Sequence, residues 1–313
     1  MNRSYELGLT EITDDTFAWL QPDGGWGWSN AGLVVGDGAS LLVDTLFDLK
    51  LTRAMLDGMA QMTAERPIGT LVNTHANGDH TFGNQLLAGA EIVATAACAE
   101  EFSDVPAEAL GAMVVADYGD PVVTEFLQRA FGPFDFGGIT MTPPTRTFSD
   151  QLSLSVGGRT VELLEVGPAH TDGDLLAYVP DAKTVFTGDI LFVYGTPIVW
   201  AGPFSNWTAA CDRILDLDVE HVVPGHGPVT DKEGARMVKA YLEFVHREAS
   251  QRHAAGMSPA DATRDIDLGE FADWGDSERL VVNVQSVYSE LDPSYELPAI
   301  DQLLAGMAHY ALR

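Results

Sequence analysis

The stretch His75-Ala76-Asn77-Gly78-Asp79-His80 decides how the rest of this sequence is interpreted. It comes one residue after residues 68–73, an apolar run with the composition of a buried strand. Imidazole and carboxylate side chains gathered on the loop after a strand are the ligands that a catalytic divalent metal ion takes. The stretch therefore predicts a metal site at the end of a strand.

Three further short segments, centred on His170, Asp189 and His226, also follow apolar runs. Loops at the carboxyl ends of neighbouring strands converge in space, so residues far apart in the sequence can build one site. A single loop histidine usually binds nothing, whereas a set of histidines and aspartates placed after strands is typical of a metal motif. The candidates suffice for two metal ions that share Asp189. They are His75, Asp79, His80, His170, Asp189 and His226.

In this order, the four segments resemble the signature of the metallo-β-lactamase superfamily. That signature is His-x-His-x-Asp-His, followed by a histidine, an aspartate in a Gly-Asp turn, and Gly-His-Gly. The resemblance covers the chain from about Glu11 to Val229 and implies a four-layer αββα sandwich with the site at one edge. It implies a first ion bound by His75 and His170, a second bound by Asp79, His80 and His226, and a bridge formed by Asp189.

Asn77 stands where that family usually has its second histidine. An amide oxygen is a weaker and harder ligand than imidazole. Three arrangements remain open: Asn77 binds the metal through its oxygen, it orients a water molecule on the metal, or the first site is vacant. We expect a weakened first site and a fully occupied second one, with one or two Zn²⁺ ions and with Fe or Mn as alternatives. Complete loss of the metal is the competing interpretation.

Asp44 ends a predicted strand and is a candidate partner of a metal-binding histidine. A carboxylate that accepts the free N–H of such a histidine fixes its tautomer and raises its basicity. Residue preference alone is almost equally compatible with a turn or N-cap aspartate before the next helix.

The predicted chemistry follows from the metal. Binding lowers the pKa of water to about 7, so a metal-bound hydroxide is available at neutral pH to attack an acyl carbonyl. Asp79 is the expected catalytic residue, which orients the nucleophile and passes a proton to the leaving group. The sequence has no Gly-x-Ser-x-Gly motif, and neither Cys98 nor Cys211 has a histidine close by, so a covalent acyl-enzyme is disfavoured.

Aromatic residues lie close in sequence to the predicted ligands. Trp26 and Trp28 stand in a glycine-rich loop that is expected to precede the first core strand, and Phe192, Tyr194 and Trp200 follow the bridging aspartate. Glycines beside tryptophans suggest a lid over an apolar, planar ligand, so these five residues form the predicted substrate pocket. Ordinary packing is the alternative explanation for each of them.

Residues 24–36, 73–85, 166–172 and 267–283 also look like stretches of the lactamase-fold cyclases and thioesterases of aromatic polyketide pathways. The leading hypothesis is a metal-dependent hydrolase that cleaves an acyl bond (thioester, ester, lactone or amide) in a bulky, partly aromatic small molecule, free or carrier-bound. One alternative is an aromatic polyketide cyclase that uses the metal as a Lewis acid, although those cyclases keep histidine at the position of Asn77. Another is a non-catalytic binding protein with a degraded metal site.

The hydrophobic pattern predicts an α/β fold in which strands alternate with helices and hairpins. Hairpin turns are expected at residues 36–38, 157–158 and 180–181, and helices over residues 49–66, 82–87 and 207–217. We expect a catalytic domain over residues 1–231, with a helical insertion over residues 99–147. A C-terminal helical extension, residues 232–313, is expected to pack on the core.

The net charge of −29 disfavours nucleic acid and membrane surfaces as partners, because both carry negative charge. Solubility is the simplest explanation of this charge, and attraction of a cationic substrate is the alternative. Two cysteines without Cys-x-x-Cys spacing exclude a disulfide framework and a zinc ribbon. No signal peptide pattern is visible, and no apolar run approaches the length of a membrane span, so the cytoplasm is the expected location. A homodimer is left open.

Overall fold

The computed structural model describes residues 5–312. Residues 1–4, where a signal peptide would begin, and Arg313, which ends the expected extension, lie outside the described residues.

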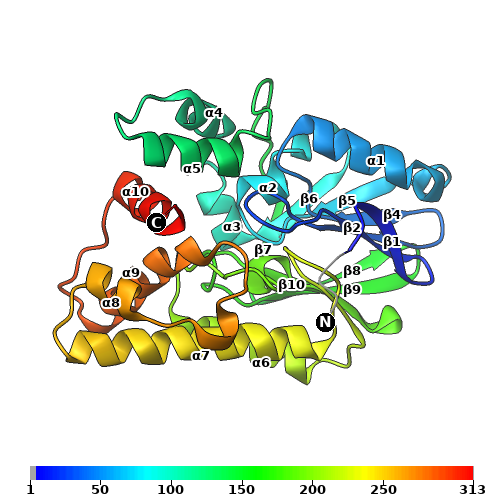
Figure 1. Ribbon diagram of the computed structural model, residues 1–313. Coiled ribbons are helices and arrows are strands. Elements are labelled where there is room, and N and C mark those ends of the chain that lie inside the picture. Colours follow the sequence, from blue (N-terminus) through cyan, green and yellow to red (C-terminus); the bar gives the residue numbers. More distant parts are fainter. Residues whose placement is uncertain (1–4, 313) are drawn as a thin grey trace.

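Two β-sheets form the centre of the molecule (Figure 1). The first sheet runs in the order β1 (Gly8–Thr13), β2 (Thr16–Leu20), β3 (Ala31–Val35), β4 (Ser40–Val43), β5 (Ile68–Val72), β6 (Glu91–Thr95) and β7 (Arg146–Phe148). The second runs in the order β12 (His221–Val223), β11 (Thr184–Phe186), β10 (Leu175–Val179), β9 (Arg159–Glu165) and β8 (Gln151–Val156). Strands β4 to β7 are parallel, as are β11 and β12, and the other pairs are antiparallel.

Ten α-helices and several 3₁₀ turns surround the sheets in the described part of the chain. The helices are α1 (Leu49–Thr63), α2 (Gly78–Thr81), α3 (Ala96–Glu101), α4 (Ala107–Val115), α5 (Pro121–Phe131), α6 (Phe204–Asp216), α7 (Lys232–Ala254), α8 (Pro259–Asp265), α9 (Leu280–Leu291) and α10 (Ile300–Ala311). The 3₁₀ turns are η1 (Asn84–Leu87), η2 (Pro180–Ala182), η3 (Gly188–Ile190), η4 (Gly269–Phe271) and η5 (Ser277–Arg279).

Alternation along the strands produces the expected layers. In β3, Leu33 belongs to the apolar cluster that contains Met55 of α1, whereas its neighbour Val34 belongs to the cluster that contains Leu163 of the second sheet. Successive strand residues point to opposite faces, so one strand serves both layers. On the far side of the second sheet, Leu176 belongs to the cluster that includes the buried residues of α6 and α7. The order helix, sheet, sheet, helix confirms the predicted αββα sandwich.

All three predicted hairpins are present, and the predicted helices lie within a few residues of their observed bounds. The short helix expected over residues 82–87 is the 3₁₀ turn η1 (Asn84–Leu87), and the short helix α2 (Gly78–Thr81), which was not predicted, comes just before it. The glycine-rich tryptophan loop was expected before the first core strand, and that expectation is wrong, because β1 and β2 precede it in the same sheet, where β1 pairs with β2 and β2 pairs with β3. The expected insertion begins inside α3 and ends inside β7, a strand too short for its alternation to be recognised in the sequence.

The helical segments outside the sandwich contact each other. Helix α5 of the insertion packs against α10 near the end of the chain, while α7 lies along α6 and α9 (Figure 1). The insertion and the extension therefore form one continuous helical layer beside the sandwich. No helix among residues 5–312 is both long enough and apolar enough to cross a lipid bilayer.

We expect removal of the chain from Lys232 onward to make the protein aggregate. Helix α7 buries Val238, Tyr241, Leu242 and Val245 completely, and its loss would expose the apolar surface of α6 that it covers. The soluble fraction and the size-exclusion profile, compared with those of the full chain, test this expectation. A soluble, monodisperse fragment ending at Asp231 would contradict it.

Candidate metal centre

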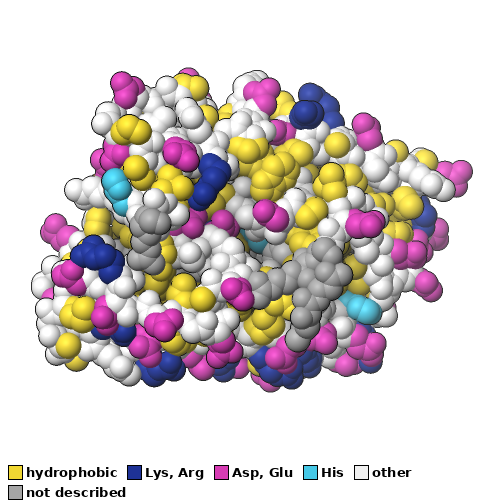
Figure 2. Space-filling view, viewed as in Figure 1, with side chains coloured by type: hydrophobic (Ala, Val, Ile, Leu, Met, Phe, Trp, Pro, Cys, Tyr) yellow, Lys and Arg dark blue, Asp and Glu magenta, His cyan; other side chains and the backbone are white. Residues whose placement is uncertain are grey.

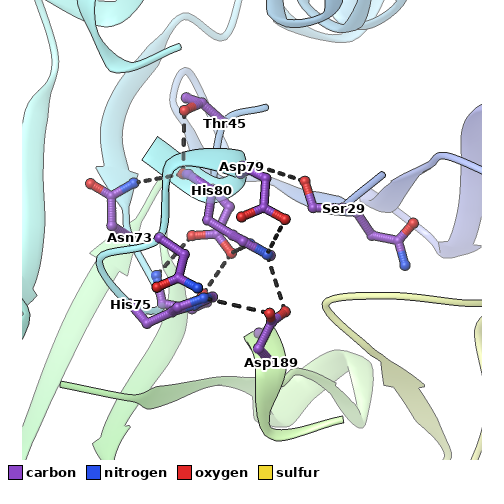
Figure 3. A network of polar contacts seen from close by, with 12 residues as sticks. Ser29, Thr45, Asn73, His75, Asp79, His80 and Asp189 are labelled. Atoms are coloured by element: carbon purple, nitrogen blue, oxygen red, sulfur yellow. Dashed lines mark hydrogen bonds and ion pairs between the residues drawn. The ribbon is translucent and has the colours of Figure 1, made fainter. Parts of the chain in front are cut away.

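The four predicted segments meet at one edge of the sandwich. His75 follows β5, His170 follows β9, Asp189 lies in the turn η3 after β11, and His226 follows β12. Figure 3 shows His75, Asp79 and His80 pointing toward Asp189, which approaches from the second sheet. Both sheets therefore contribute side chains to the same cluster.

Asp189 is the centre of this cluster. Its Oδ2 lies 3.6 Å from Nε2 of His75 and 3.3 Å from Nε2 of His170. Its Oδ1 lies 3.1 Å from Nε2 of His80 and 3.5 Å from Nε2 of His226. One carboxylate oxygen thus faces each histidine pair, which is the arrangement that a bridging ligand requires.

Asp79 completes the half of the cluster that holds His80 and His226. Its Oδ2 lies 3.2 Å from Nε2 of His226 and 3.9 Å from Nε2 of His80. Two sets of donor atoms are close enough to share an ion, one formed by His75, His80 and Asp189 and the other by Asp79, His80 and His226. Asp79 is 8% exposed, against 3% for Asp189, so it is the cluster carboxylate most open to solvent.

Each histidine ring is oriented by a bond at its other nitrogen. These bonds join Nδ1 of His75 to Thr74 Oγ1 (3.0 Å), Nδ1 of His80 to Asp44 Oδ2 (3.0 Å), Nδ1 of His170 to the Ile198 carbonyl (2.7 Å) and Nδ1 of His226 to the Gly24 carbonyl (3.1 Å). A partner at Nδ1 leaves Nε2 free to bind a metal and fixes the direction in which it points.

Three buried atoms that could bind a metal make no hydrogen bond, although the two ring nitrogens among them lie within ion-pair distance of the Asp189 carboxylate. They are Nε2 of His75, Nε2 of His80 and Oδ1 of Asp189. Buried polar atoms nearly always make hydrogen bonds, so three that face one another without one indicate a shared cation. A divalent cation bound by imidazole nitrogens and carboxylate oxygens fits this donor set.

The charge balance of the centre also favours a bound cation. Burial lowers the pKa of His226, but the carboxylates of Asp189 and Asp79 outweigh it and raise that pKa to about 9. Burial likewise opposes the charged form of His80, and Asp189, Asp79 and Asp44 together raise its pKa well above the usual range. The cluster therefore attracts positive charge, which a dication would supply.

Asp44 lies in the position expected of a histidine partner. It is buried at a positive φ of 64°, accepts from the backbone N–H and the hydroxyl of Thr74 (2.7 Å each), and contacts His80. The alternative interpretation as an N-cap is wrong, because Asp48 caps α1 by accepting from the backbone N–H of Leu51 at 2.7 Å.

Asn77 lies beside the histidine pair of the first predicted site. Its Nδ2 is 3.2 Å from Nε2 of His170, and its backbone begins helix α2. The amide nitrogen therefore contacts the ring nitrogen that would otherwise bind a metal. Oxygen ligation, orientation of a water molecule and an empty first site all remain predictions.

The predicted aromatic pocket residues occupy different positions. Phe192 is buried and stacks on the ring of His226 (centroids 5.0 Å apart, planes 8° apart), so it supports a predicted ligand instead of lining a pocket. Trp28 packs on Phe134 of the insertion, and Trp26 packs on other phenylalanines of the same segment. Tyr194 and Trp200 are half-buried on the segment that follows Phe192.

The tryptophan loop is fastened to the centre. The hydroxyl of Ser29 donates to the Asp79 carbonyl at 2.6 Å, and the Gly24 carbonyl accepts from the ring of His226. Trp26 donates through Nε1 to Glu278 at 2.8 Å. Three separate segments hold this loop, so it forms a fixed wall of the site and not the lid that its glycines suggested. Figure 2 shows a hollow near the middle of this face, with histidine surface visible beneath hydrophobic side chains.

Some residues that build the centre were missed from the sequence. Asn84 donates to Asn73 at 2.8 Å, Thr45 donates to Asn84 at 3.0 Å, and Asn73 donates to the His80 carbonyl at 3.2 Å. All are fully buried and tie the ligand-bearing loop to its neighbours. Two asparagines next to apolar runs on either side of the ligand stretch were the available signal.

Comparison with known proteins gives one family. The model of the family described as "Metallo-beta-lactamase superfamily" matches residues 24–226, which include all the predicted ligands. The match therefore spans more than half of the chain.

Curated relatives share parts of the sequence. The alpha subunit of 2,4-dinitroanisole O-demethylase from Nocardioides sp. is 26% identical over 62% of this chain and 51% of its own length. A hydroxyacylglutathione hydrolase from Brucella anthropi is 26% identical over 44% of this chain and 46% of its own length. The chain thus spans about half the length of these relatives.

A solved structure shares the fold more widely. The sec-alkylsulfatase Pisa1 from Pseudomonas sp. superposes with a TM-score of 0.66 over 92% of this chain and 51% of its own, at 18% sequence identity. At this identity the likeness concerns the fold alone. The finer likeness to aromatic polyketide cyclases stays a prediction.

We expect His226→Ala to lower the metal content of the protein, because it removes one donor and the ring that Phe192 supports. Metal content is measured by elemental analysis of protein purified without chelator. His309→Ala is the matched control, since His309 is exposed on α10 and pairs with Asp120 of the insertion at 2.9 Å. Unchanged metal content in the His226 variant would show that the ligand assignment is wrong.

Asn77→His is expected to raise metal stoichiometry toward two ions per chain. The new imidazole would replace the amide beside His170 and complete the first histidine set. Titration of metal-free protein with Zn²⁺ by calorimetry gives the stoichiometry of both forms. Equal stoichiometry in both would mean that Asn77 already completes the first site.

Proposed function

Because this chain belongs to the metallo-β-lactamase superfamily, we propose that it is a metal-dependent hydrolase that cleaves an acyl bond of a bulky, partly aromatic small molecule. The observation that carries the proposal is the carboxylate of Asp189, which faces four imidazole nitrogens inside a buried cluster with unpaired donor atoms. A thioester, an ester, a lactone and an amide are the bonds considered.

When bound, a divalent metal supplies a Lewis acid and lowers the pKa of water, which is the chemistry that acyl hydrolysis needs. In this chain Asp189 joins the two histidine pairs, and the Nδ1 partners hold the rings so that Nε2 points inward. Zn²⁺ is the proposed ion, with Fe or Mn as alternatives that the same donor set accepts.

Asp79 is the proposed catalytic residue. Among the three carboxylates of the centre it is the most exposed, so it is the one best placed to reach a bound substrate. Its backbone carbonyl is fixed by the hydroxyl of Ser29 at 2.6 Å, while its Oδ2 faces His226. In the proposal its carboxylate accepts a proton from the attacking water and passes it to the leaving group.

Covalent catalysis by a thiol finds no support. Cys98 and Cys211 are both completely buried, and burial raises the pKa of both thiols. A buried, protonated thiol is a poor nucleophile.

The size and character of the substrate are inferred from the walls of the site. Trp28 packs on Phe134, with ring centroids 4.9 Å apart, and Ser29, the next residue in the tryptophan loop, contacts Asp79. An apolar wall near polar donors is typical of a small-molecule site. The net charge of −29, visible as acidic side chains over the face in Figure 2, favours a small molecule over nucleic acid or a membrane surface. A carrier-bound acyl group also fits this proposal.

A second bond class is favoured by the relative named 2,4-dinitroanisole O-demethylase, whose match covers 62% of this chain. An aryl methyl ether has an aromatic body and a stabilised phenolate as its leaving group. The same metal-binding donors and the same proton carrier could serve its hydrolysis, so this substrate belongs in the test.

The test is hydrolysis of four substrates by protein loaded with Zn²⁺: an aromatic acyl thioester, an aryl ester, an aromatic lactone and 2,4-dinitroanisole. We expect turnover of at least one acyl substrate, lost on chelation and restored by Zn²⁺. We expect Asp79→Asn to lower kcat by at least about 100-fold with less effect on KM, since a proton carrier acts in the transition state.

Turnover of 2,4-dinitroanisole alone would replace the acyl bond by an ether bond in the proposal. Metal-loaded protein that acts on none of the four would overturn the hydrolase proposal and favour a binding function.

A further inference from the structure

Residues 192–200, called the bracing loop here, touch two of the predicted ligands. Phe192 stacks on the ring of His226 with centroids 5.0 Å apart, and the backbone N–H of Val193 donates to the His226 carbonyl at 2.9 Å. The Ile198 carbonyl accepts from Nδ1 of His170 at 2.7 Å. The position of this loop therefore sets the orientation of both rings.

The outer side of the bracing loop is held by the C-terminal extension. Thr196 donates through its backbone N–H to the Gly275 carbonyl, and Gly275 donates in turn to the Tyr194 carbonyl, both at 2.9 Å. Asn283 accepts from the backbone N–H of Val199 at 3.0 Å and donates to the Pro197 carbonyl at 2.8 Å. Gly275 and Asn283 both belong to the extension, so the extension fixes the bracing loop at several points.

Arg279 is the deepest part of this support. Its side chain is 2% exposed, and its guanidinium lies 4.2 Å from the ring of Trp26 and 5.1 Å from the ring of Phe192. It donates through one terminal nitrogen to the Thr196 carbonyl at 2.9 Å and pairs through the other with Asp276 at 3.0 Å. A flat cation in contact with two rings and two oxygens has one orientation, so it fixes its neighbours.

Glu278, the neighbour of Arg279 in the sequence, holds Trp26 of the tryptophan loop. Glu278 is buried and accepts from Nε1 of Trp26 at 2.8 Å, while Trp26 packs on Phe126 and Phe131 of the insertion. Trp26, Arg279, Phe192 and His226 therefore form a continuous series of contacts from the insertion to the candidate metal centre. Burying a guanidinium costs free energy unless it is fully paired, and here Nε remains unpaired. A contribution to folding stability is therefore a weak explanation for a buried arginine at position 279.

We propose that Arg279 is a positioning residue of the metal centre: through Phe192 it holds His226 in the orientation that binds metal, and through Thr196 it holds the bracing loop against His170. This inference rests on the proposed metal-dependent function and assigns part of it to the C-terminal extension. Loss of a residue that orients a metal ligand typically weakens metal binding by about 10- to 100-fold.

The experiment measures Zn²⁺ affinity by competition with a chromophoric chelator, using the full chain and Arg279→Met. The absorption spectrum of the Co²⁺-loaded forms reports the geometry of the ligands. We expect Arg279→Met to bind Zn²⁺ about 10- to 100-fold more weakly and to change the Co²⁺ spectrum. Arg252→Met is the matched control, because Arg252 lies in the same extension and pairs with Glu248 and Asp265 instead of the bracing loop.

Wild-type affinity and spectrum in folded Arg279→Met would overturn the inference, as would an equal loss in Arg252→Met. If Arg279→Met does not fold, Arg279→Lys keeps the buried charge but lacks the flat, forked group. A loss of about tenfold or more in that variant supports the inference, and a smaller one overturns it. Failure of the wild-type chain to bind Zn²⁺ would instead contradict the proposed function, so the two failures are distinguishable.

Discussion

The structure depends on one buried carboxylate. Asp189 lies between four imidazole rings contributed by loops of both sheets, and each of its oxygens faces two ring nitrogens. A buried charge without compensation is strongly unfavourable, so these loops must converge for the fold to tolerate it. The αββα sandwich satisfies this requirement, because its strands end at a common edge and carry the rings inward.

The rings are oriented by residues outside the predicted ligand set. Asp44, Thr74 and two backbone carbonyls hold the Nδ1 atoms, so each Nε2 is directed toward the centre. The insertion and the C-terminal helices add a second level of support, since Trp26 is held by both of them. The insertion and the C-terminal helices, although they lie outside the sandwich, therefore support the walls of the site.

The sequence was sufficient where the signal was short-ranged. The hairpins and the four ligand segments are each recognised from fewer than about fifteen consecutive residues. The order of the four segments then indicated the family and its fold. From the sequence, Asp44 could be either a partner of a histidine or a turn or N-cap residue. The 3.0 Å contact between Asp44 and His80 in the structure distinguishes the two. Strands β1 and β2 were not recognised, and the tryptophan loop was consequently misplaced.

The proposed role of Arg279 could not be found from short sequence patterns, because Trp26 and Glu278, which share its cluster, are 252 positions apart. Phe192 was taken for a pocket residue because aromatic character alone does not distinguish a ring that faces substrate from one that faces a ligand.

The late position of Arg279 in the chain has a consequence for biosynthesis. All the predicted ligands, ending with His226, leave the ribosome before the segment that braces them. During translation the donor atoms can therefore gather while their support is still being made, and the centre reaches its final rigidity only when the last helices dock. If Arg279 positions the ligands as proposed, a nascent chain would hold a metal ion less tightly than the finished protein. On that proposal, the order of residues along the chain would place the gathering of the ligands before the completion of their support.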